Sequence, residues 1–328
     1  MSDRSEKLTI WCNAKFSAPV MQRLAEGTRA HTLIHAASAS TSVLAAGTAD
    51  PALPKADIAF GQPDPTQCIA LPKLRWVEVT TAGYGRYDTP EFKETLKARG
   101  SAFTNVSQVF GDPCAQHVLG MMLALGRQLL PSYRDQITDR SWHYEQRRYD
   151  SRLLNGQTVL MLGYGAIGRA LADMLAPFKM KLIAVRRSVH SERGVRIISE
   201  ESVSSALGEA DHIVNILPDN ASTRQYVNAR RLSCCKPSAR FYNVGRGCTV
   251  DDRALLEALQ SGRLGAAYLD VFDPEPLPKE HPFWTAPNCF ITPHTAGGHH
   301  NQDERIVEHF LQNLAAFQRG EPLVDRIV

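Results

Sequence analysis

Short apolar runs alternate with a helical pattern along roughly the first third of the chain. The predicted helix is Val20–Ala25, and the apolar runs are Leu8–Cys12, Ile58–Phe60, Trp76–Val79 and a run around Phe103. Alternation of strands with helices is typical of a parallel sheet that helices cover on both faces. The pattern therefore predicts an α/β fold for this part.

A long apolar helix is predicted to begin at Asp112. Asp112 suits an N-cap, and Pro113 suits the first helical position. Pro131 should stop or kink this helix. The segment Arg134–Arg152 follows and is dense in Arg, Tyr and Asp. We expect it to be a structured surface excursion because it has aromatic residues to bury, Trp142, Tyr144 and Tyr149.

The clearest part of the pattern begins with a buried strand, Gln157–Leu162. A glycine-rich turn, an amphipathic helix (Arg169–Ala176) and a second strand (Met180–Val185) follow it. The later predicted elements are strands His212–Ile216, Ala239–Asn243, Ala266–Val271 and Cys289–Ile291, and helices Asp251–Gln260 and Asn301–Arg319. This order predicts a second doubly wound parallel sheet.

The composition of the chain mainly excludes classes of partner, location and site. The chain has 328 residues, enough for two domains, and a formal charge of +3, which gives no reason to expect nucleic acid or a membrane as partner. The charged start lacks the apolar core of a secretory signal. Seven scattered cysteines without a Cys-x-x-Cys pair indicate reduced thiols in a cytoplasmic protein and no metal site.

The glycine turn carries the first candidate chemistry. Its spacing is Gly-x-Gly-x-x-Gly, between a strand and a helix, which is the context of a dinucleotide-binding fingerprint. The glycines permit a tight turn, close approach of a pyrophosphate, and close packing of helix and strand. The predicted cofactor contacts are Gly163, Tyr164, Gly165, Ala166, Ile167 and Gly168.

The end of the second strand bears on the choice of cofactor. NAD sites usually place a carboxylate there, whereas this chain has Arg186, Arg187 and Ser188. Guanidinium groups pair well with a phosphate. We therefore predict NADP(H) in preference to NAD(H).

Four motifs in one order give a resemblance that covers nearly the whole chain. They are Gly163–Gly168, Asn243-Val-Gly-Arg246-Gly247 with Val250-Asp251, Asp270-Val-Phe-Asp-Pro-Glu275-Pro-Leu, and Ile291-Thr-Pro-His294-Thr-Ala-Gly297. With them the chain resembles the D-isomer-specific 2-hydroxyacid dehydrogenase family. The arginine pair is similar to the branch of NADPH-dependent glyoxylate and hydroxypyruvate reductases. The resemblance implies reduction of a small 2-keto acid to the D-2-hydroxy acid.

The chemistry of that reaction suits three residues of these motifs. The guanidinium of Arg246 can pair with a planar carboxylate. A histidine side chain has an intrinsic pKa near neutrality, so His294 suits a proton donor, and Glu275 would hold its imidazole in one tautomer and favour the protonated form. The resemblance implies these roles, and it also implies that Asp270 reaches the nicotinamide carboxamide.

The resemblance places substrate binding in a loop of the first domain as well. Backbone N–H groups of such a loop hold the substrate carboxylate in the family, and the matching residues here are Ala82, Gly83 and Tyr84. Tyr84 stands where the family often has a smaller aliphatic residue. Gln116 stands where the family often has Glu.

The implied architecture is two Rossmann-like domains with the active site in the cleft between them. The substrate-binding domain would comprise residues 1–107 and 294–328, and the dinucleotide-binding domain residues 108–293. The family is usually dimeric, so we expect a homodimer through the helix after Asp112 and the segment Arg134–Arg152.

Three other functions share features with this pattern. A formate dehydrogenase would pair its His with Gln, and Glu275 argues against it. A nucleotide-sensing transcriptional corepressor shares the fold and these residues. No appended tail or interaction segment in the sequence supports that function. A methyltransferase also uses a glycine-rich turn, but it would want an acidic residue where Arg186 stands.

Overall fold

The computed structural model describes residues 6–37, 48–188 and 192–328. The chain divides into two compact units, unit 1 (Met1–Phe110 with His299–Val328) and unit 2 (Gly111–Gly298). Sequence analysis placed the second domain boundary after residue 293, and in this division residues 294–298 lie in unit 2. They are held there by Asp270, whose carboxylate accepts hydrogen bonds from the N–H groups of Thr295 and Ala296.

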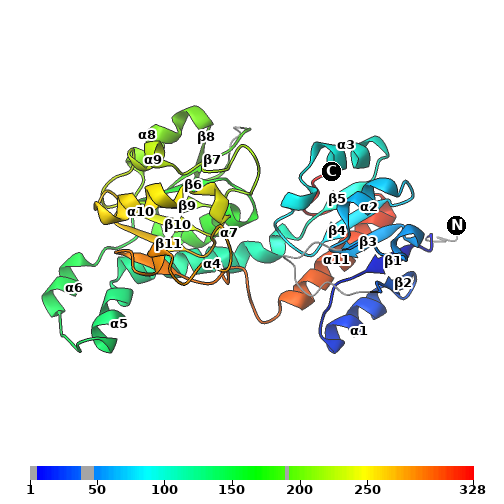
Figure 1. Ribbon diagram of the computed structural model, residues 1–328, viewed down its shortest axis with the longest axis horizontal. Coiled ribbons are helices and arrows are strands. Elements are labelled where there is room, and N and C mark those ends of the chain that lie inside the picture. Colours follow the sequence, from blue (N-terminus) through cyan, green and yellow to red (C-terminus); the bar gives the residue numbers. More distant parts are fainter. Residues whose placement is uncertain (1–5, 38–47, 189–191) are drawn as a thin grey trace. The chain divides into compact units, whose positions relative to one another are not determined.

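Unit 1 contains a parallel sheet in the order β2-β1-β3-β4-β5 (Figure 1). Its strands are β1 (Thr9–Cys12), β2 (Thr32–His35), β3 (Ile58–Gly61), β4 (Trp76–Val79) and β5 (Ala102–Thr104), and its helices are α1 (Ala18–Gly27), α2 (Pro65–Ala70), α3 (Pro90–Ala98) and α11 (Gln302–Arg319). Side chains alternate between the two faces of each strand. Phe60 and Trp76 therefore pack against α11, where Phe310 stacks on Phe60, while Val77 faces Phe92 of α3.

The last residues of the chain return along strand β5. Phe103 donates from its N–H to the carbonyl of Val328 at 3.1 Å, and Ile327 donates to the carbonyl of Phe103 at 2.8 Å. An antiparallel bridge joins Thr104 to Arg326. Strand β5 thus has β4 on one side and the C-terminal segment on the other.

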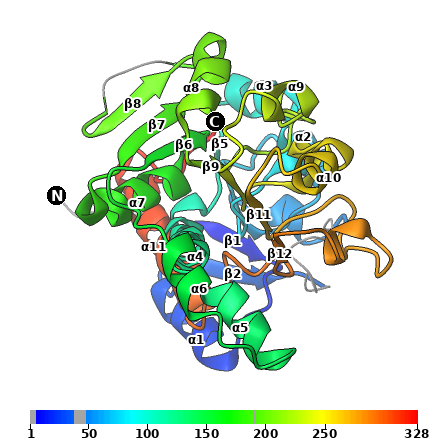
Figure 2. The same ribbon diagram turned by 90° about the vertical axis from the view of Figure 1, so that its left-hand side faces the viewer.

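Unit 2 contains a larger parallel sheet in the order β12-β11-β10-β9-β6-β7-β8, and Figure 2 labels all of these strands except β10. Its strands are β6 (Thr158–Leu162), β7 (Lys181–Val185), β8 (Val195–Ile198), β9 (His212–Asn215), β10 (Arg240–Asn243), β11 (Ala266–Leu269) and β12 (Cys289–Ile291). Its helices are α4 (Ser107–Gly126), which begins in unit 1, α5 (Leu129–Ile137), α6 (Tyr144–Asp150), α7 (Ala166–Leu175), α8 (Val203–Glu209), α9 (Ala229–Leu232) and α10 (Asp252–Gln260). Helices α4 and α7 cover one face, and α8, α9 and α10 cover the other.

Helix α4 starts and ends earlier than the sequence predicted. It begins at Ser107 and contains Pro113, so Asp112 is not its N-cap. Its first N–H groups find acceptors in the side chains of Asn105 and Asp325, which explains why the helix extends back past the proline. It ends at Gly126, and Pro131 lies in the first turn of α5, where a proline costs no hydrogen bond.

Helices α5 and α6 form an arm that stands away from the sheet of unit 2 (Figure 1). The expectation that the arm buries its aromatic residues is wrong for the single chain. Trp142 is 90% exposed and Tyr149 75% exposed. Among the described residues, no helix is both long and apolar enough to cross a membrane.

Candidate active site

The glycine turn follows strand β6 and opens helix α7. Gly163 has a φ of +94°, which side chains rarely adopt. A Cβ atom at Gly168 would lie 2.9 Å from the ring of Tyr164 and 3.2 Å from the side chain of Ile216, so packing requires a glycine there. Both positions are therefore explained by the fold alone.

Gly165 is different, because packing does not require it. A Cβ atom at this position would meet nothing within 4 Å. Gly165 is the N-cap of α7, and the N–H groups of Ala166 and Ile167 in the first helical turn have no acceptor within the helix. Open space beside these N–H groups fits the pyrophosphate of a dinucleotide, which needs close approach to the backbone.

The arginine pair lies just after strand β7. Arg186 is half-buried and Arg187 exposed, and Nη1 of Arg186 lies 3.5 Å from Oε1 of Glu192. Sequence analysis identified no carboxylate at this end of the strand. Strand β8, which the sequence also missed, pairs with β7 and returns Glu192 to the end of that strand. The apolar residues of Val195–Ile198 were the available signal for it.

Arg246 sits on a loop that is packed against its surroundings on both sides. A Cβ atom at Gly245 would lie 2.7 Å from the carbonyl oxygen of Leu217, and one at Gly247 only 2.0 Å from the carbonyl carbon of Phe272. The half-buried Arg246 donates from Nη1 to the carbonyl of Gly245 at 2.6 Å. The two glycines thus fix the backbone from which this guanidinium extends.

His294 and Glu275 form a close pair. Nδ1 of His294 lies 2.7 Å from Oε2 of Glu275, and the two side chains are 37% and 24% exposed. The other oxygen of Glu275 accepts a hydrogen bond from the N–H of Phe272 at 2.8 Å. Phe272 is also the residue against which Gly247 packs, so the loop of Arg246 and the pair of Glu275 with His294 share this backbone segment of unit 2.

Asp270 holds the loop that carries His294. It is 1% exposed, and its carboxylate accepts from the hydroxyl of Thr292 at 2.5 Å as well as from Thr295 and Ala296. Its carbonyl accepts from the N–H of His294 at 2.8 Å. Contact between Asp270 and the nicotinamide stays a prediction, since these oxygens already serve the loop.

The loop Ala82–Tyr84 follows strand β4 in unit 1. The carbonyl of Ala82 accepts from Asn105 at 2.6 Å, and that of Gly83 accepts from Thr81 at 2.7 Å. The ring of Tyr84 packs edge-on against Phe103, with centroids 5.8 Å apart. The larger side chain is thus accommodated in the core of unit 1. Sequence reasoning missed both donors, Thr81 and Asn105.

No cluster of His, Cys, Asp or Glu within the described part of the chain could hold a metal ion. All seven cysteines are free thiols. Burial raises the pKa of Cys114 to about 12, and the same cause raises that of Cys68 to about 12. These thiols are therefore poor candidates for nucleophiles.

The motifs and the fold are shared with known proteins. The family model described as D-isomer specific 2-hydroxyacid dehydrogenase, NAD binding domain, matches residues 119–296. A glyoxylate reductase of Pyrococcus furiosus is 30% identical over 257 residues, covering 76% of this chain and 74% of its own.

Two solved structures resemble nearly all of the chain. A D-isomer specific 2-hydroxyacid dehydrogenase of Xanthobacter autotrophicus Py2, in complex with NADPH and MES, has a TM-score of 0.81 at 25% identity, with 98% of each chain covered. An NADPH-dependent glyoxylate/hydroxypyruvate reductase of Sinorhizobium meliloti, in complex with NADP and sulfate, has a TM-score of 0.77 at 25% identity, with 98% of each chain covered. The dinucleotide-binding fold, the motifs and these likenesses agree, and the chain belongs to the D-isomer-specific 2-hydroxyacid dehydrogenase family of oxidoreductases.

Proposed function

We propose that this protein is an NADPH-dependent reductase that converts a small 2-keto acid, of the glyoxylate or hydroxypyruvate type, to the D-2-hydroxy acid. The contact of His294 with Glu275 carries the proposal, because a carboxylate at Nδ1 of an imidazole favours the protonated ring that a proton donor needs. The relative from Pyrococcus furiosus and the structure from Sinorhizobium meliloti support this substrate class by their names.

The proposed reaction divides its tasks among three side chains. Arg246 pairs with the substrate carboxylate and draws electron density from the adjacent carbonyl. A bound nicotinamide cofactor supplies the hydride that reaches C2. His294, held at Nδ1 by Glu275, gives a proton from Nε2 to the oxygen that becomes the hydroxyl. The negative charge of Glu275 stabilises the protonated imidazole before this transfer.

The same pair separates the proposal from a formate dehydrogenase. Oxidation of formate produces no alkoxide to protonate, so a neutral amide partner would suffice for the His of such an enzyme. The carboxylate of Glu275 instead accepts from Phe272 and contacts His294. This arrangement favours a reaction in which the imidazole carries and delivers a proton.

The preference for NADP is part of the proposal. Arg186, Arg187 and Ser188 would supply donors and positive charge to the 2′-phosphate, at the end of strand β7. Glu192 should weaken this preference for NADP, because the Glu192 carboxylate lies 3.5 Å from Arg186 and competes for that guanidinium. We expect Arg186 to exchange Glu192 for the phosphate when NADP binds.

A homodimer is also proposed, with the arm of α5 and α6 in its interface. Large apolar side chains of the arm are exposed in the single chain, namely Leu129, Tyr133, Ile137, Trp142, Tyr144, Tyr149 and Leu153. Exposed apolar surface on such a scale usually marks a contact with another protein. Sedimentation analysis of the purified protein tests this point.

The decisive experiment is turnover of NADPH and NADH with a panel of keto acids. We expect higher kcat/KM with NADPH and activity with glyoxylate or hydroxypyruvate. A protein that binds the cofactor tightly but reduces no keto acid would support the nucleotide-sensing corepressor instead.

A further inference from the structure

Two side chains hold consecutive carbonyl groups of the loop Ala82–Tyr84. Nδ2 of Asn105 donates to the carbonyl of Ala82, and Oγ1 of Thr81 donates to that of Gly83, at 2.6 and 2.7 Å. Asn105 directly follows strand β5, so the loop is held by a residue outside itself. Thr81 also receives a hydrogen bond from Gln62 at 3.3 Å.

These two contacts determine where the N–H groups of the loop point. A trans peptide is planar, and its C=O and N–H bonds point in opposite directions. Neither peptide bond of the loop is cis. Because the carbonyl of Ala82 faces Asn105, the N–H of Gly83 faces the other way, and Thr81 orients the N–H of Tyr84 in the same manner.

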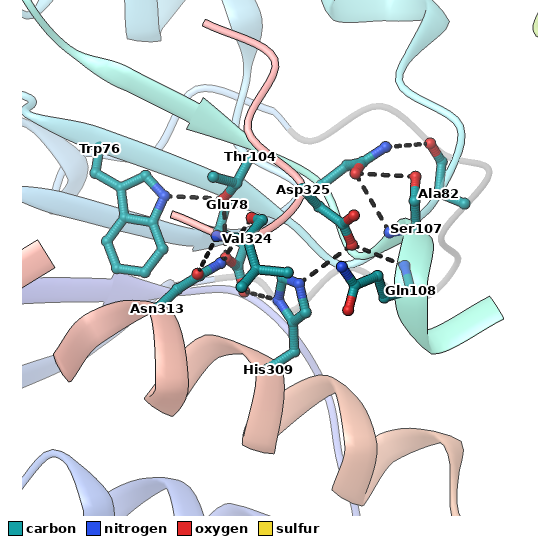
Figure 3. Close-up of polar contacts among 11 residues, drawn as sticks. Trp76, Glu78, Ala82, Thr104, Ser107, Gln108, His309, Asn313, Val324 and Asp325 are labelled. Atoms are coloured by element: carbon teal, nitrogen blue, oxygen red, sulfur yellow. Dashed lines mark hydrogen bonds and ion pairs between the residues drawn. The ribbon is translucent and has the colours of Figure 1, made fainter. Parts of the chain in front are cut away.

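Asn105 is itself fixed by the C-terminal segment and by the start of α4. Its Oδ1 accepts from the hydroxyl of Ser107 at 3.0 Å, which leaves Nδ2 for Ala82. Its N–H donates to the carbonyl of Asp325 at 3.2 Å. The carboxylate of Asp325 accepts from the N–H of Gln108 at 2.7 Å (Figure 3).

Asp325 belongs to a buried ionic triad with His309 and Glu78. The imidazole of His309 lies 3.2 Å from each carboxylate, through Nδ1 to Glu78 and through Nε2 to Asp325. Glu78 is fully buried, and its other oxygen accepts from Thr104 and Asn313 (Figure 3). Buried charges are costly unless they are paired, and the triad pairs them while it joins α11 to strand β4 and to the C-terminal segment.

We infer that Thr81 and Asn105 are positioning residues that aim the loop's N–H groups at the substrate carboxylate, with the triad of Glu78, His309 and Asp325 as the anchor of Asn105. The inference rests on the proposed function, and on the role that the family resemblance implies for this loop, namely that its N–H groups bind the substrate carboxylate together with Arg246. It assigns specificity for an anionic substrate to a polar network that contains none of the reacting groups.

Substitutions at Thr81 test the inference most cleanly. Thr81→Val keeps the shape of the side chain but removes the hydroxyl, whereas Thr81→Ser keeps the hydroxyl. We expect Thr81→Val to raise KM for glyoxylate on the order of 10-fold, with KM for NADPH unchanged, and Thr81→Ser to stay near wild type. Thr28→Val is the matched control, because the buried Thr28 hydroxyl donates to the carbonyl of Leu24 in the same unit, away from the loop.

Asn105→Asp is the second arm. It keeps the acceptor for Ser107 but turns the donor to Ala82 into a repelling oxygen. We expect weaker binding of oxamate, a planar keto-acid analogue, to the protein saturated with NADP, measured by calorimetry. Thermal unfolding of each variant shows whether it folds.

The outcomes separate the inference from the proposed function. Folded Thr81→Val and Asn105→Asp variants with wild-type KM and oxamate affinity would refute the inference while the proposed function stands. A control Thr28→Val that raises KM equally would reduce Thr81 to a structural role and also overturn the inference. A wild-type protein without keto-acid reduction would refute both.

Discussion

Gly247 lies against the main chain of Phe272 so closely that a Cβ atom on it would come within 2.0 Å of the Phe272 carbonyl carbon. Phe272 in turn donates its N–H to Glu275 at 2.8 Å. The loop of Arg246 and the pair of Glu275 with His294 are therefore built on the same backbone segment. A displacement of one should move the others.

Substitution of Gly247 by alanine should consequently lower catalytic efficiency as well as stability. The methyl group cannot fit without moving Phe272, which shifts Arg246 and Glu275 together. We expect kcat/KM for the keto acid to fall by about 100-fold or more, since misplacement of about 1 Å has that effect, and stability to fall by about 1–3 kcal/mol. Gly208→Ala is the control, because its added Cβ would make only an ordinary contact at 3.6 Å. Near-normal kinetics of Gly247→Ala would show that the segment is not rigid.

His294→Gln should abolish most reduction and leave NADPH affinity nearly intact. The amide cannot deliver a proton, and general acid catalysis typically contributes about 10² to 10⁴-fold. Steady-state kinetics and fluorescence titration with NADPH measure the two effects separately. Retention of more than about half of kcat would exclude His294 as the proton donor.

Glu275→Gln removes the negative charge beside His294 but keeps the acceptor for Phe272. The protonated imidazole loses its partner, so reduction should decline at a lower pH than in the wild type. The loss should be small in acid and grow towards neutral and alkaline pH. A pH–rate profile that coincides with that of the wild type would mean that the pair is not coupled.

Substitutions of Arg186 and Glu192 should change the affinity for NADPH in opposite directions. Arg186→Asp should weaken NADPH strongly and spare or improve NADH, because a carboxylate repels the 2′-phosphate. Glu192→Gln should strengthen NADPH by about 3- to 10-fold, since it releases Arg186 from competition. The ratio of kcat/KM for the two cofactors decides the matter. A wild-type enzyme that prefers NADH would make the arginines a solvated strand end.

The buried triad predicts a pH dependence of stability. Burial disfavours the charged imidazole of His309, but Asp325 and Glu78 outweigh this and raise its pKa to about 9, above the ordinary 6.5. Because this pKa is higher in the folded than in the unfolded state, protonation of His309 stabilises the folded protein fully below about pH 6.5. That contribution to the free energy of unfolding is lost as the pH rises through about 9. The linked free energy is on the order of 3 kcal/mol.

His309→Gln should accordingly destabilise the protein most in the acid and neutral range. We expect the difference in unfolding midpoint between wild type and variant to shrink from pH 6 towards about pH 9. Thermal unfolding at matched ionic strength measures it. A difference independent of pH would show that His309 is neutral in the folded protein.

Local signals of the sequence predicted most strands and the glycine turn, because apolar runs and glycine spacing report directly on them. They failed where a distant residue decides the structure. The carboxylate that caps Gln108 at the start of α4 comes from Asp325, 217 positions away. In the same way, Glu192 reaches Arg186 only through the pairing of β8, and Asn105 reaches Ala82 only through the sheet. The sequence indicated the residue types of the candidate site, but it did not indicate the distant residues that hold those side chains and loops in place.

The pairing of the C-terminal segment with β5 has a consequence for handling the protein. Strand β5 ends the sheet order of unit 1, and Arg326, Ile327 and Val328 cover its outer side. A bare strand edge exposes a row of N–H and C=O groups that another chain can pair with. Removal of these residues should therefore leave the outer edge of β5 unpaired and promote edge-to-edge association of one chain with another, which light scattering of the truncated protein would detect.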